Sequence, residues 1–95
     1  MFLSAYHFDG DPGALVPAYD AFARTFPPNA LELHACVVTT AGITVYDACP
    51  TRAAFEQFHR STAFRSAVAA AGLPLPRIEP LGEVHRAVAG EAVAR

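Results

Sequence analysis

Residues 31–47, LELHACVVTTAGITVYD, constrain the fold of this chain more than any other stretch. They contain two alternating runs rich in β-branched residues, joined by the sequence TAG at 40–42, and this pattern predicts a β-hairpin. A helix-like stretch precedes the hairpin, another follows it, and a strand-like run lies at each end. The order strand, helix, strand, strand, helix, strand predicts an α+β, ferredoxin-like βαββαβ sandwich with a four-stranded antiparallel sheet.

The bounds of these elements follow from turn and capping residues. We expect strands at 2–8, 31–39, 43–48 and 77–88. Asp11 followed by Pro12 predicts the start of a first helix that reaches about residue 25. Pro17 would cost that helix one backbone hydrogen bond, so a start within 14–17 is the alternative.

The second helical region is predicted to begin after Thr51, a suitable N-cap residue. Ser61 interrupts the helical pattern and is predicted to cap a second short helix. Residues 1–88 are then expected to form one domain, and residues 89–95 a C-terminal tail.

The length of the hairpin loop decides which side chains share a face of the sheet. A three-residue loop at 40–42 would place Leu33, Ala35 and Val37 with Ile43 and Val45, forming an aliphatic face under the helices. The same loop places His34, Cys36 and Val38 with Thr44 and Tyr46 on the helix-free face. A two-residue loop would split the aliphatic face, so we expect the three-residue loop.

The polar side chains assigned to the helix-free face form the candidate site. We predict His34, Tyr46 and Tyr6 as catalytic residues, because an imidazole can take a proton and a phenol can stabilise the resulting oxyanion. The residues predicted to contact substrate are Ser4, Phe8, Cys36, Val38, Glu83 and His85.

Each of these residues also has a structural interpretation. His34 could bond across the two-fold axis of a dimer, and Tyr6 and Tyr46 could be amphipathic interface residues. His7 alternates with Tyr6 and is expected to face the helices, whereas His59 is expected to face solvent.

The amino-acid composition limits the classes of binding partner that we expect. An apolar content of 53% in 95 residues is more than a small monomer can bury, which predicts a homodimer. The net charge is −2 and the seven basic residues are scattered Arg, so nucleic acid and membranes are not expected partners. No apolar run approaches the roughly 20 residues that span a bilayer. Without a signal peptide or a disulfide framework, the chain is expected to be cytoplasmic.

Metal and cofactor motifs are not found in the sequence. The four His at positions 7, 34, 59 and 85 form no short-spaced pair of the kind that binds metals. The sequence DGDPG does not have the spacing or the Lys of a phosphate-binding loop. We therefore expect neither a metal nor a cofactor.

Residues 53–72, AAFEQFHRSTAFRSAVAAAG, contain two aromatics followed by Ser and Phe, namely Phe55, Phe58, Ser61 and Phe64. This pattern resembles the dimeric α+β barrel superfamily, which includes antibiotic-biosynthesis-monooxygenase-like proteins, small heme-degrading monooxygenases and certain polyketide cyclases. The heme-degrading members carry a Trp as the second aromatic and a later His on iron. Phe58 and Val68 stand at those places here, so heme degradation is not expected.

The resemblance implies a small dimeric enzyme acting on a hydrophobic or aromatic metabolite in a sheet-lined cavity. Its chemistry would be of the cofactor-free monooxygenase or cyclase type. The alternative is a non-catalytic ligand-binding or structural dimer.

Overall fold

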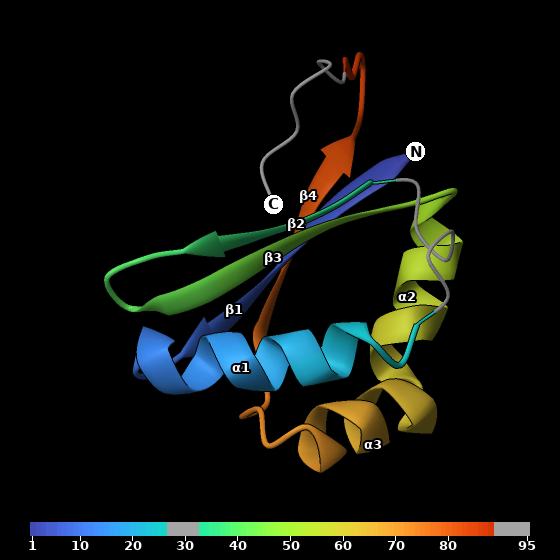
Figure 1. The fold of residues 1–95 in the computed structure, drawn as a ribbon. Helices are drawn as coiled ribbons and strands as arrows, with labels where there is room; N and C mark the ends of the chain where they lie inside the picture. The colour runs from blue at the N-terminus through green and yellow to red at the C-terminus, as the bar shows by residue number, and fades with distance from the viewer. Residues whose placement is uncertain (27–32, 89–95) are drawn as a thin grey trace.

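A four-stranded antiparallel sheet with all three helices on one of its faces makes up the fold (Figure 1). The computed structural model describes residues 1–26 and 33–88. Its elements are β1 (Phe2–Asp9), α1 (Pro12–Ala23), β2 (Leu33–Val38), β3 (Gly42–Cys49), α2 (Arg52–Arg60), α3 (Thr62–Ala70) and β4 (Arg77–Glu83). The strand order is β2-β3-β1-β4. This α+β arrangement fits a ferredoxin-like fold, with three helices in place of the two in the simple βαββαβ order.

The predicted helix caps are confirmed. The Asp11 side chain accepts a hydrogen bond from the backbone N–H of Gly13 at 3.1 Å, and α1 runs from Pro12 through Pro17, so the later start is wrong. The Thr51 side chain accepts a hydrogen bond from the backbone N–H of Ala54 in α2 at 3.0 Å. Ser61 caps α3 in the same way at 3.1 Å.

The end of the last strand differs from the prediction. β4 ends at Glu83 instead of residue 88, because its pairing partner β1 begins at Phe2; the backbone N–H of Val84 still donates to the carbonyl of Met1 at 2.8 Å, and the chain then leaves the sheet. The predicted tail, residues 89–95, and the first two residues of the predicted second strand lie outside the described residues.

The β2–β3 hairpin has a two-residue loop, so the predicted three-residue loop is wrong. Val38 pairs with Ile43, and the backbone N–H of Thr39 donates to the carbonyl of Gly42 at 2.9 Å, which leaves residues 40–41 as the loop. Gly42 belongs to β3 instead of the loop. Its φ is +152°, and a Cβ there would lie 2.0 Å from the carbonyl oxygen of Phe8. Gly is therefore required at this position because β1 passes close beside it.

This register reverses the predicted faces of β2. His34, Cys36 and Val38 lie on the helix side, together with Ile43 and Val45. The prediction that these three residues lie on the helix-free face is wrong, because an even loop shifts the pairing by one residue and turns every side chain over.

The helix-free face, hereafter the open face, carries the remaining side chains of the central strands. Leu33 and Val37 lie there with exposed fractions of 41% and 44%, so their predicted burial under the helices is wrong. His7 also lies on this face, contrary to prediction. Its ring nitrogens bond Thr44 Oγ1 at 3.0 Å and Glu79 Oε1 at 2.9 Å, linking three strands.

Aromatic side chains fill the space between the sheet and the helices. Phe55 is 1% exposed, with its ring 5.3 Å from that of Phe2 and 6.5 Å from that of Tyr6. Phe64 extends the cluster to Phe58 at 5.0 Å. Phe55 and Phe64 are thus buried in the core, and Phe58 is partly buried against it. Among the described residues, no helix has the length and apolar character needed to cross a membrane.

The close approach at Gly42 can be tested by comparing two Gly→Ala substitutions. Gly72 also has a positive φ, +81°, but a Cβ there would meet nothing within 4 Å. We expect Gly72→Ala to lower the free energy of unfolding by about 1 kcal/mol and Gly42→Ala by about 3 kcal/mol or more. Urea denaturation measures both. Equal losses would contradict the two-residue loop and its register.

Candidate functional site

Asp47 is a buried carboxylate in the middle of β3, on the helix side of the sheet. It is 4% exposed and stands in the otherwise apolar strand GITVYDAC. A charge in this position needs close polar partners. The residue directly opposite on β2 is His34, whose Nδ1 lies 2.5 Å from Asp47 Oδ1. The ladder register therefore supplies the partner.

His34 contacts a second group through its other ring nitrogen. Nε2 is hydrogen-bonded to the hydroxyl of Tyr19 on α1, and the two rings stack with centroids 5.7 Å apart and planes inclined by 13°. An ionised carboxylate only accepts hydrogen bonds, so Nδ1 of a neutral His34 carries the proton and Nε2 accepts from the phenol. We call Tyr19, His34 and Asp47 the relay.

The three residues of the relay differ in exposure. The side chain of His34 is 32% exposed and that of Asp47 is 6% exposed, while Tyr19, on α1, is partly buried. Burial raises the pKa of Tyr19 to about 12, and the nearby charges of Cys36, Asp47 and Asp20 act in the same direction. The phenol is therefore protonated at neutral pH and donates to His34.

This arrangement has the parts of an acid–base site. A hydroxyl bonded to an imidazole, itself oriented by a buried carboxylate, can accept a proton from a substrate while passing its own proton inward. The thiol of Cys36 lies two residues along β2 from His34, and burial raises its pKa. A raised pKa disfavours the thiolate, so Cys36 is a poor nucleophile.

The structure divides the residues predicted for one site between two faces. His34, Cys36 and Val38 form a row along β2 on the relay side. Ser4, Tyr6 and Phe8 lie on the same side but are buried in the core. Tyr46 pairs with Ala5 and Ala35, which places it on the open face. Glu83 and His85 line a pocket together with Leu3 of that face.

Tyr6 is separated from the relay by its burial. It is 2% exposed, its ring packs 5.6 Å from that of Phe64, and its hydroxyl has no hydrogen-bond partner among the described residues. Burial raises the pKa of Tyr6 above its usual range. The Ser4 hydroxyl donates to the main-chain oxygen of Asp47 at 3.4 Å. Tyr6 is therefore a core residue whose hydroxyl makes no hydrogen bond of ordinary geometry to any described residue, although the Ser4 hydroxyl lies near enough to lower its pKa in part.

Sequence reasoning missed two of the three relay residues. Tyr19 recurs at helical spacing with Leu15, Phe22 and Phe26, a pattern that is typical of residues packed on a core. Asp47 carried a usable signal, because a lone carboxylate in a buried strand is rare unless it is paired. Its partner could be identified only from the correct hairpin register.

No protein-family model matches the chain, and no curated protein matches it significantly. Within the described ranges, no three His, Cys, Asp or Glu side chains converge into a group that could hold a metal ion.

Two Tyr→Phe substitutions distinguish a bonded hydroxyl from an unpaired one. We expect Tyr19→Phe to lower the free energy of unfolding by about 0.5–1.5 kcal/mol, because it removes the hydrogen bond to His34. Tyr6→Phe removes a buried hydroxyl without a partner and should leave stability unchanged or slightly higher. Thermal and urea denaturation at pH 7 compare the two variants. A larger loss for Tyr6→Phe would contradict the assigned hydrogen bonds.

The raised pKa of Tyr19 also predicts how the free energy of unfolding depends on pH. Folding raises the pKa of Tyr19 from its ordinary value of 10.0 to about 12. Its contribution to stability is therefore complete below about pH 10 and is lost as pH rises toward 12. We expect the wild type to lose more stability than Tyr19→Phe over this range. Parallel stability curves for the two proteins would contradict the raised pKa.

Proposed function

We propose that the protein is a small enzyme that removes a proton from a hydrophobic phenolic or enolisable metabolite at the relay. The reaction would be of the cofactor-free monooxygenase or cyclase type. The observation that carries this proposal is the bonded series Tyr19–His34–Asp47, with its phenol on α1, its imidazole exposed to solvent and its carboxylate in the core. Its two thiols suit the reducing cytoplasm, the location we propose.

The proton would move in one concerted step. The oxygen of Tyr19 accepts a proton from the substrate O–H or acidic C–H while its own proton passes to Nε2 of His34. The imidazolium that forms already donates from Nδ1 to Asp47, so the buried carboxylate stabilises its charge. The products are the substrate phenolate or enolate and a protonated His34. The substrate anion can then add molecular oxygen and take the proton back from His34, and the hydroperoxide that forms loses water to leave a carbonyl group. In a cyclase the anion would instead attack a carbonyl group within the same molecule.

The surroundings of the relay favour an apolar substrate. Cys36 and Val38 follow His34 on the same side of β2. Cys36 is half-buried and Val38 is 60% exposed. An aromatic ring lying along this row would cover exposed apolar surface and bring its hydroxyl or carbonyl group toward Tyr19.

The proposed proton abstraction can be tested with 2-tetralone, a bicyclic ketone with acidic C–H bonds. Its exchange of hydrogen for deuterium in D₂O at pH 7 is followed by proton NMR. We expect the wild type to accelerate exchange and His34→Gln to reduce the acceleration about 100-fold or more, because the base is removed. Tyr46→Phe, on the open face, is the matched control and should exchange like the wild type.

Circular dichroism of each variant separates loss of chemistry from loss of fold. Exchange by folded His34→Gln at the wild-type rate would overturn the role of His34. A wild-type protein that does not accelerate exchange would overturn the proposed reaction.

We also propose that the protein is a homodimer that pairs open faces into an α+β barrel. Leu33 and Val37 expose apolar side chains on this face, and such surface favours association. Three polar side chains of the face are already bonded to one another, with His7 between Thr44 and Glu79. A partner could therefore cover them without leaving buried polar atoms unpaired. A non-catalytic dimer would share this interface.

Sedimentation velocity tests the interface with two charge insertions. We expect the wild type to sediment as a dimer and Val37→Glu as a monomer, because the change buries a charge in the contact. Leu75→Glu is the control, since Leu75 is 73% exposed in the loop before β4 and should leave the dimer intact. A monomeric wild type, or a dimeric Val37→Glu variant, would contradict the proposed interface.

A further inference from the structure

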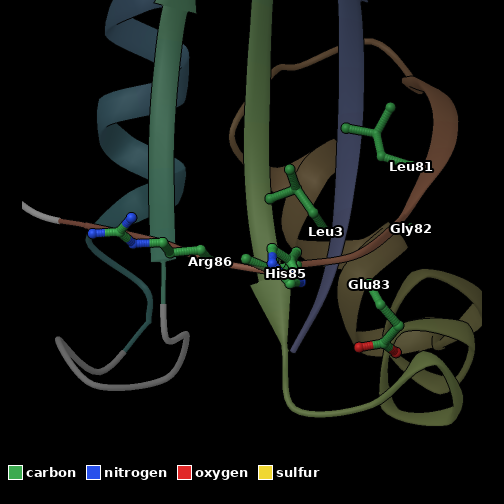
Figure 2. A pocket seen from close by; sticks show the side chains of 7 residues that line it. Leu3, Leu81, Gly82, Glu83, His85 and Arg86 are labelled. Carbon is green, nitrogen blue, oxygen red and sulfur yellow. The ribbon is translucent and has the colours of Figure 1, made fainter.

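A shallow pocket of about 390 Å³ lies beside β1 and β4, away from the relay. Leu3 and Leu81 form its apolar walls, and the segment 84–86 that follows β4 forms its rim. Viewed as in Figure 2, this segment runs across the ends of β1 and β3 toward β2, with His85 beside Leu3. The volume lies within the range of small-molecule sites.

The pocket results from the way β4 ends. The register of β4 against β1 shifts between Leu3 and Ser4, and the backbone N–H of Val84 is held by the carbonyl of Met1 at 2.8 Å. The chain beyond Val84 then stands off the sheet. Gly82 lines the pocket, and a Cβ at this position would meet nothing within 4 Å. The space in front of its backbone is therefore unfilled.

In the part of the chain that the structure describes, the positive charge at the rim of the pocket has no neighbouring negative charge to balance it. Arg86 has no carboxylate within ion-pairing distance among the described residues, and His85 next to it also has no bonded partner there. The one carboxylate of the lining, Glu83, lies 3.6 Å from the N-terminal ammonium group of Met1. The rim therefore presents an uncompensated cation above apolar walls.

We infer that this pocket is a second binding site, for a small organic acid with an apolar body. The apolar part would lie against Leu3 and Leu81, and the carboxylate would face Arg86 and His85. The relay lies on the opposite side of the sheet, so this site is separate from the one proposed for proton abstraction. The pocket lies at the β4 edge of the open face, whereas the proposed dimer contact at Leu33 and Val37 lies on β2 at the other edge. Glu83 and His85, which the sequence assigned to a single site with His34, belong to this second site.

The test is a titration of the ¹⁵N-labelled full chain with hexanoate, followed by amide chemical shifts. We expect saturable shifts at Leu3, Gly82 and Val84, and smaller shifts with hexanol, which has the same apolar body but no charge. Arg86→Ala should weaken hexanoate binding about three- to fivefold, as the loss of one partly exposed ion pair would. Arg65→Ala, an exposed Arg on α3, is the matched control and should bind like the wild type.

Three results would overturn the inference. They are the absence of saturable shifts, shifts that map to the helix side of the sheet, and equal binding of hexanol and hexanoate. Leu81→Ser provides a second variant that does not depend on charge. Because Leu81 is 45% exposed, this change should not impair folding. If hexanoate binds this variant as tightly as the wild type, Leu81 is not part of the binding site.

Discussion

The pairing of His34 with Asp47 across β2 and β3 is the interaction on which the candidate site depends. Burying a carboxylate costs several kcal/mol unless a hydrogen-bonded partner compensates. The Asp47 side chain is 6% exposed, and the imidazole directly opposite on the ladder provides that partner at 2.5 Å. A slip of one residue in the hairpin would turn His34 to the open face and leave the carboxylate without it. The polar pair therefore favours one register and orients His34 toward Tyr19.

The sheet separates two kinds of surface. Its helix side holds the aromatic core around Phe55, and the relay lies at the border of that core, where α1 meets β2. Its open face carries apolar side chains from β2 and a polar group centred on His7 that is internally bonded. The proposed proton-transfer site and the proposed dimer interface therefore lie on opposite faces and share no residues.

The sequence predicted the features that depend on neighbouring residues. The caps at Asp11, Thr51 and Ser61 and the order of the strands follow from local rules, and the structure has them. The hairpin register was wrong because two assumptions failed. Gly42 was assigned to the loop, although it is required by the close approach of β1, which no local pattern reveals. The aliphatic residues of β2 were assigned to the core, although Leu33 and Val37 lie on the open face.

The protonation state of the His34 ring is the most direct measure of the relay. A ¹⁵N–¹H long-range correlation spectrum distinguishes the two tautomers of neutral His, and a His34→Gln variant identifies which signals belong to this ring. Hydrogen bonding to Asp47 and Tyr19 predicts a proton on Nδ1 and an unprotonated Nε2 that accepts from the phenol. A neutral ring protonated mainly on Nε2 would show that Nδ1 does not donate to Asp47, and the account of the site would fail.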